Sequence, residues 1–205
     1  EDLRPAAFAA AALGGDIRSD VLAHSLAALN LDPERAMASM RRAQIVLASG
    51  GDRMRWPHAL LQEHLLTQLS LQKNASRVFR AAADALALHP NAAMRRILRQ
   101  RVVNLTRAGD VDAAAKLLHE HIALVWGRTR EVAATLRDLA LLDGRLSGTA
   151  AAMQKRWRAE ALRYAGKLED ARREAEDARR IFQAADDLEN AAHCLRLLGH
   201  IASEM

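Results

Sequence analysis

The sequence RMRWPHALLQEHLLTQL, residues 53–69, organises the N-terminal part of the chain. Residues 53–56 are expected to form a short strand that runs directly into a helix. Pro57 suits the first helical position, because its fixed φ fits there and its missing N–H is not needed. One stripe of this helix is expected to carry His58, Leu61, Leu65 and Leu69, widened by Leu60 and Leu66.

His58 stands in the first turn of that predicted helix. The backbone N–H groups of a first turn lack partners and the helix dipole is positive there, so an anion can bind. The alternative interpretation is that His58 only caps the helix and packs against Trp56.

The residues before this stretch predict three helices. The first is expected at residues 5–13, where Gly14-Gly15 ends it, and the second at residues 20–29, with Ser19 as its N-cap. Asp32 and Pro33 predict the start of the third helix, as its cap and its first residue.

A β-hairpin is predicted between the third helix and residue 57. Residues 44–48 and 53–56 are expected to pair as two strands, joined by the turn Ser49-Gly50-Gly51-Asp52. Three helices, a two-stranded wing and a further helix make a winged-helix architecture over residues 3–71.

A winged helix raises DNA binding as an alternative function. The N-terminal part of the third helix would meet the bases, and it offers Glu34, Arg35 and Met37, a poor set for base edges. Arg53 and Arg55 of the wing could touch phosphate. We therefore expect no DNA binding through this part of the chain.

The segment from Trp56 to Glu63, with its His-Ala-Leu-Leu core, resembles the end of the winged-helix domain in STAND-type signal-transduction NTPases, the bacterial regulators related to the NB-ARC and NACHT switches. The following RVFRAAADALAL, residues 77–88, resembles the helix that comes next in that family. The resemblance implies that His58 contacts the β-phosphate of bound ADP, and that the winged helix stabilises an ADP-bound off state.

Residues 91–107 predict a further helix with an apolar arc. A basic face lies opposite and gathers Arg95, Arg96, Arg99 and Arg107. This face is either solvated or a site for an acidic partner. Arg101 falls within the apolar arc and is expected to snorkel or to meet an acidic neighbour.

The C-terminal half contains a repeated turn. Residues 108–114 (AGDVDAA) and 165–171 (AGKLEDA) match each other, while residues 142–146 and 185–188 form weaker copies. A small residue after each turn, Ala114 or Ala171, lets the second helix pack closely on the first. These features resemble degenerate tetratricopeptide repeats, whose helix pairs stack into a solenoid.

Such a solenoid has a concave face that binds proteins or peptides. The basic side chains predicted as candidates for this face are Arg158, Arg163, Arg172, Arg196 and His200. The alternative interpretation is that these side chains are solvated surface charges without a binding function.

Composition agrees with a helical, cytoplasmic protein. Half of the 205 residues are hydrophobic and only 3% are aromatic, so Ala and Leu, which favour helices, must fill the core. The single cysteine, Cys194, is expected to be a buried thiol. The net charge of +5 is modest for a nucleic-acid surface. We expect neither a signal peptide nor a membrane span, and the chain without an initial Met is expected to be an excised fragment.

Motifs of catalysis are absent from the sequence. It contains no GxxxxGK[ST], GxGxxG, HExxH, CxxC or GxSxG. His119 and His121 stand two apart on a helix and point to different sides, so no metal site is expected.

The chain is therefore expected to be mainly α-helical and non-catalytic, with a winged-helix domain at residues 1–72 and a helical linker and repeat solenoid at residues 73–205. The expected function is a regulatory fragment of a STAND-type ATPase whose repeats bind a protein or peptide, with Arg95, Arg96, Arg99, Arg158, Arg163 and Arg196 as partner-binding candidates. ATP or ADP would be bound only by the full-length protein, through a nucleotide-binding domain before this chain. The alternatives are a free-standing repeat scaffold and a DNA-binding transcription regulator.

Overall fold

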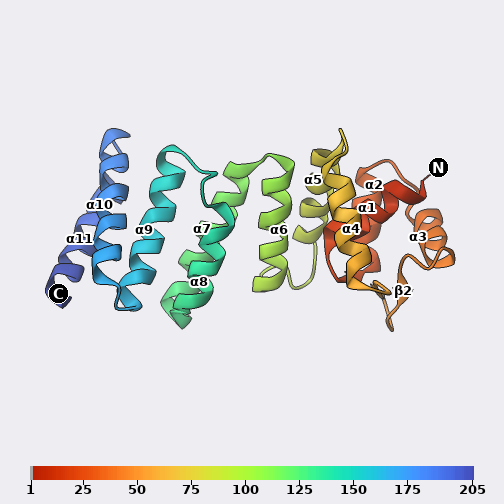
Figure 1. The fold of residues 1–205 in the computed structure, drawn as a ribbon, viewed down its shortest axis with the longest axis horizontal. Helices are drawn as coiled ribbons and strands as arrows, with labels where there is room; N and C mark the ends of the chain where they lie inside the picture. The colour runs from red at the N-terminus through yellow and green to blue at the C-terminus, as the bar shows by residue number, and fades with distance from the viewer. Residues whose placement is uncertain (1) are drawn as a thin grey trace. The chain divides into compact units, whose positions relative to one another are not determined.

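The computed structural model describes residues 2–205 and is mainly α-helical, with one small antiparallel sheet (Figure 1). This confirms the predicted helical class. The chain divides by its contacts into two compact units: unit 1 extends to Asp110, and unit 2 is Val111–Met205.

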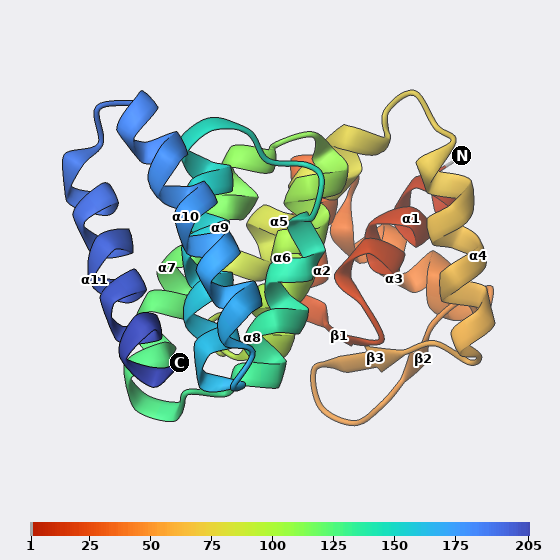
Figure 2. The same cartoon turned by 60° about the vertical axis from the view of Figure 1, so that its left-hand side comes forward.

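Unit 1 combines helices with a three-stranded sheet. Its elements are α1 (Leu3–Leu13), β1 (Asp16–Arg18), α2 (Ser19–Ala28), α3 (Pro33–Arg42), β2 (Leu47–Ala48), β3 (Arg53–Arg55), α4 (Ala59–Ser70), α5 (Ala75–Ala87) and α6 (Arg95–Ala108). The strands lie in the order β1-β3-β2, visible at the lower edge of this unit in Figure 2. Ile17 faces Met54 across β1 and β3, and both side chains are buried, so this register turns the apolar side of the sheet to the core.

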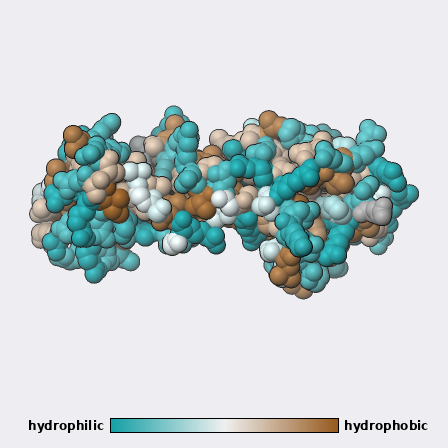
Figure 3. All heavy atoms as spheres, turned by 90° about the horizontal axis from the view of Figure 1, so that it is seen from above, coloured by the Kyte–Doolittle hydropathy of each residue, from teal (hydrophilic) through white to brown (hydrophobic). Residues whose placement is uncertain are grey.

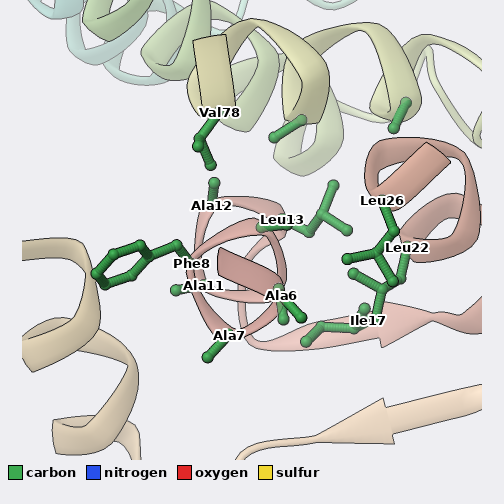
Figure 4. Close-up of a cluster of buried hydrophobic side chains, with 14 of the residues drawn as sticks. Ala6, Ala7, Phe8, Ala11, Ala12, Leu13, Ile17, Leu22, Leu26 and Val78 are labelled. Carbon is green, nitrogen blue, oxygen red and sulfur yellow. The ribbon is translucent and has the colours of Figure 1, made fainter. Parts of the chain in front are cut away.

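The core of unit 1 surrounds α1. Every residue of α1 from Ala6 to Leu13 is buried, as expected for a helix that is apolar on all sides. Its many alanines allow other helices to approach closely. Figure 4 shows Leu22 and Leu26 of α2 and Val78 of α5 directed toward α1.

The C-terminal end of α1 receives side-chain donors from three other segments. Trp56 Nε1 donates to Gly14 O at 2.8 Å, and Gln62 Nε2 donates to Ala11 O at 3.1 Å. The Ala12 carbonyl accepts from two amides of α6, Gln100 Nε2 and Asn104 Nδ2, both at 2.9 Å. These bonds supply donors to the carbonyls at a buried helix end, where intrahelical donors run out; Ala11 O also accepts from the Gly14 N–H at 3.3 Å.

Helices α5 and α6 belong to this compact unit. The predicted helical linker begins at residue 73, and the first helix after that position, α5, packs on α1, α2 and α6. By its contacts, this compact unit extends to Asp110.

Several local predictions are confirmed. Asp32 caps α3 through bonds from the N–H groups of Glu34 and Arg35, and Pro33 is its first residue. The hairpin turn uses Gly50 and Gly51 at φ of 82° and 52°, a region that favours glycine. Leu69 is buried and Leu61 and Leu65 pack against the core, as the stripe on α4 predicts.

Other local predictions are wrong. Pro57 precedes α4, which begins at Ala59 with His58 in the N-cap position, because the chain stays extended through His58 (φ −142°, ψ 137°). Ser19 is the first residue of α2, and Arg18 occupies its N-cap position. Leu60 is 75% exposed and adds nothing to the apolar face.

Unit 2 contains only helices among its described elements. They are α7 (Val111–Thr129), α8 (Val132–Leu139), the 3₁₀ turn η1 (Ala140–Leu142), α9 (Gly148–Tyr164), α10 (Leu168–Ala184) and α11 (Leu188–Glu204). α9 contacts both α7 and α11, while α10 packs on α9 and α11 and α8 packs on α9 and α7. The helices therefore form two layers, α7-α9-α11 and α8-α10.

Alanines allow the close packing of α10. Ala171, Ala175 and Ala178 are fully buried at the spacing of one helical stripe, and Phe182 completes it. Cys194 of α11 is buried beside Ala178 and Phe182, which confirms the predicted core thiol. Gly166, with φ of 71°, makes the turn between α9 and α10.

Candidate functional site

His58 lies at the surface of unit 1, in the N-cap position of α4. Its side chain is exposed and makes no capping hydrogen bond. Trp56, its proposed packing partner, is buried and directs its indole N–H to Gly14. His58 is thus accessible, and its contact with a nucleotide stays a prediction.

The predicted basic face of α6 lies on unit 1. Arg96 and Arg53 both approach Asp16, with Arg96 Nη2 at 3.6 Å from Asp16 Oδ2. Arg95 and Arg99 also have partners. Arg101 is half-buried; burial lowers its pKa and the charge of Asp84 opposes this shift, so the predicted acidic neighbour is present.

Two predicted arginines of unit 2 are engaged within the unit. Arg158 pairs with Asp143 and lies 3.5 Å from Glu174. Arg163 pairs with Glu204 at 2.5 Å and with Glu160 at 3.3 Å. A partner would compete with these carboxylates. Arg172 is held in the same way, by Glu169 and Glu176 of its own helix.

Arg196 and His200 line a groove between α9 and α11. Figure 3 shows hydrophilic residues over most of the face in view, with hydrophobic atoms in small areas between them. The groove has a volume of about 250 Å³, and its walls are Arg156, Trp157 and Glu160 from α9 and His193, Arg196, Leu197 and His200 from α11.

The two walls occupy equivalent positions. Arg196, Leu197 and His200 follow Arg156, Trp157 and Glu160 at an offset of 40 residues, and α9 and α11 themselves begin 40 residues apart, at Gly148 and Leu188. Arg156, Trp157 and His193 were not among the predicted site residues, because the repeated turns alone do not align the helices. The 40-residue offset between the helix starts is the signal that identifies them.

Arg156 is the most unusual charge of the groove. Its Nη2 donates to Met153 Sδ at 3.2 Å, a weak acceptor, and its guanidinium lies 4.7 Å from the centre of the Trp157 ring. Its Nε is buried without a hydrogen-bond partner in the part of the chain described. Burial lowers the pKa of Arg156, although Glu160 partly opposes this.

Two histidines next to Arg156 are held neutral. Burial, with the charge of Arg156 in addition, lowers the pKa of His119 on α7 to about 4, and His119 Nε2 is buried without a partner among residues 2–205. Burial and then the charges of Arg196 and Arg156 lower the pKa of His193. His119, Arg156 and Arg196 are each the ninth residue of their helices, α7, α9 and α11.

Over residues 2–205, no three His, Cys, Asp or Glu side chains gather in a metal-binding arrangement. Within the same range, no helix has both the length and the apolar character needed to cross a membrane.

Comparisons with protein-family models, with curated proteins and with solved structures give no match to this chain.

Proposed function

We propose that the chain is a non-catalytic regulatory fragment in which unit 2 binds a protein or peptide partner. The observation that carries this proposal is the groove between α9 and α11, where equivalent positions of two neighbouring helices place cations beside Trp157. Its volume of about 250 Å³ is smaller than the roughly 300–1,000 Å³ typical of sites for drug-sized ligands. It therefore suits one or two side chains of a longer ligand.

The two-layer arrangement of unit 2 supports a tetratricopeptide-like solenoid. Alternating helices lie in the same layer, and alanines fill the contact between layers. Solenoids of this kind bind extended segments along the helices of one layer. The groove lies between two helices of one layer, as such binding requires.

Unit 1 is proposed to be a winged-helix domain of the kind found in STAND-type regulators. Its element order, helix-strand-helix-helix-strand-strand, and its strand order β1-β3-β2 support this assignment. His58 would then meet a phosphate of ADP, in a full-length protein that contains a nucleotide-binding domain. The exposed position of His58 at the start of α4 is compatible with that role.

Selection of displayed random peptides on the 205-residue chain tests the partner-binding function. Enriched peptides are then titrated by calorimetry, and hydrogen exchange locates the residues they protect. We expect protection in α9 and α11, and binding that is weakened by Trp157→Ala and retained by Arg180→Ala, a change on the exposed face of α10 outside the groove.

Failure to enrich any binding peptide would overturn the proposal for unit 2. Protection confined to unit 1 would overturn it as well, because the ligand would then use another surface.

A further inference from the structure

We infer that the groove between α9 and α11 binds the carboxylate of an acidic peptide, and that Arg156 is the residue that holds it. This inference rests on the proposed function, since it names the ligand class of the same groove.

Arg156 differs from the other cations of α9. Lys155 pairs with Glu174 and Asp177, and Arg158 and Arg163 are each held by carboxylates. Arg156, by contrast, forms no ion pair within residues 2–205, and its hydrogen bond goes to a thioether. The other long cations of α9, Lys155, Arg158 and Arg163, are therefore each paired with a carboxylate of the chain. Arg156 has no such partner in the described part of the chain and is available to an external anion.

Because Arg156 is partly buried, an anionic partner would stabilise its guanidinium. A half-buried guanidinium has lost part of its hydration, and the buried Nε–H of Arg156, which has no hydrogen-bond partner in residues 2–205, is costly in that state. A carboxylate can accept two parallel N–H bonds from a guanidinium, and such bonds are stronger where water is partly excluded. The ligand would supply the acceptor that the chain itself lacks.

The net charge of the groove favours a ligand group that carries one negative charge. Its lining contains two guanidinium groups, Arg156 and Arg196, and one carboxylate, Glu160, which leaves a formal net charge of +1 with the histidines counted as neutral. The lowered pKa of His193 keeps that ring neutral at pH 7, so it adds no charge. One carboxylate balances this net charge, whereas a phosphate dianion would exceed it and face Glu160.

Apolar groups beside Arg156 set a second requirement. Trp157 and Leu197 face the groove at equivalent positions, one from each wall. The ligand is therefore expected to carry an apolar side chain next to its Asp or Glu, in contact with the indole ring.

Calorimetry with matched peptides tests the inference. The probes are acetylated and amidated hexapeptides with one Glu beside a Leu or Phe, the same peptides with Gln for Glu, and the same peptides with phosphoserine for Glu. They are titrated into the full chain and into Arg156→Gln and Arg156→Lys variants, with Arg180→Gln as the matched control.

We expect the Glu peptide to bind the unaltered chain and the Arg180→Gln variant about tenfold or more tightly than the Gln peptide, as charge-assisted bonds imply. Arg156→Gln should abolish this preference, and Arg156→Lys should restore only part of it, because an ammonium lacks the planar fork.

The experiment distinguishes failure of the carboxylate site at Arg156 from failure of peptide binding by unit 2. Equal binding of the Glu and Gln peptides, or tighter binding of the phosphoserine peptide, would overturn the carboxylate site and leave peptide binding intact. Absence of binding by all three peptides, together with failure of the peptide selection, would overturn both. If Arg156→Gln fails to fold, the Glu–Gln comparison on the unaltered chain decides.

Discussion

Unit 1 and unit 2 are stabilised in different ways. Unit 1 has one continuous core around the buried helix α1, and buried polar side chains such as Asn104 bond to the end of that helix. Unit 2 has smaller clusters made largely of alanine, and ion pairs link its helices. The core of unit 1 is therefore stabilised by contacts between residues distant in sequence, whereas unit 2 is stabilised by contacts between neighbouring helices.

A matched pair of core truncations should have the largest effects. Phe79 of unit 1 and Phe182 of unit 2 are both buried, so each change to Ala should lower the free energy of unfolding by about 3–5 kcal/mol. Denaturant unfolding followed by hydrogen exchange should show faster exchange throughout unit 1 for Phe79→Ala. For Phe182→Ala the increase should be confined to unit 2 and be strongest in α10 and α11. An identical exchange pattern in both variants would contradict the comparison.

Acid should destabilise unit 2 through His119. Its pKa is about 4 in the folded chain against an ordinary value of 6.5, because burial disfavours the charged ring. The unfolded chain therefore binds the proton first, and up to about 3 kcal/mol of the free energy of unfolding is lost as pH falls from about 6.5 to about 4. His193 contributes in the same direction.

His119→Gln should flatten this part of the pH profile, measured by urea unfolding at several pH values. His200→Gln, an exposed histidine of the same unit, serves as control and should retain the slope. An unchanged slope in His119→Gln would show that His119 is hydrated in the folded chain.

Removal of the indole N–H should cost unit 1 an intermediate amount. Trp56→Phe keeps an aromatic ring in the core but leaves the Gly14 carbonyl without this donor, which should lower the free energy of unfolding by about 1–3 kcal/mol. Urea unfolding measures the change. A loss well below this range would mean that water replaces the indole at the end of α1.

The ion pairs of unit 2 should contribute less individually. A double-mutant cycle on Lys155 and Asp177, whose atoms lie 3.0 Å apart, should give a coupling energy of about 0.2–1 kcal/mol, because both side chains are about one-third exposed. A coupling above this range would show that the network with Glu174 acts cooperatively.

The smallest effect on stability is expected at His58. Since the side chain is exposed and caps nothing, His58→Ala should leave the urea midpoint unchanged. In a full-length protein with a nucleotide-binding domain, the same change should weaken ADP binding and raise basal output. Unchanged ADP affinity would leave His58 without the proposed phosphate contact.

Local signals predicted much of this fold, because they depend on few residues. Asp32-Pro33 defines the start of α3, and the glycines of the hairpin require their turn whatever surrounds them. Strand β1 escaped prediction, since its three residues carry no pattern of their own and acquire their role by pairing with Arg53–Arg55.

The candidate groove was only partly predictable, because it too depends on contacts between residues that are distant in sequence. Arg196 and His200 were identified as surface charges, but the importance of Arg156 depends on which neighbours lack a carboxylate. Pairing of that kind is decided by how α9 packs against α10 and α11. A sequence containing many arginines and glutamates does not reveal which of them meet.

The three tryptophans lie in different environments and can serve as intrinsic fluorescent probes. Trp56 belongs to unit 1 and is buried, Trp126 is buried against Tyr164 with ring centres 5.6 Å apart, and Trp157 stands in the groove beneath a guanidinium. Because the sequence contains three tryptophans, replacing any two by phenylalanine leaves a single emitter at a known place. Fluorescence from the variant that keeps only Trp157 would report occupancy of the groove, and fluorescence from the variant that keeps only Trp56 would report the integrity of unit 1.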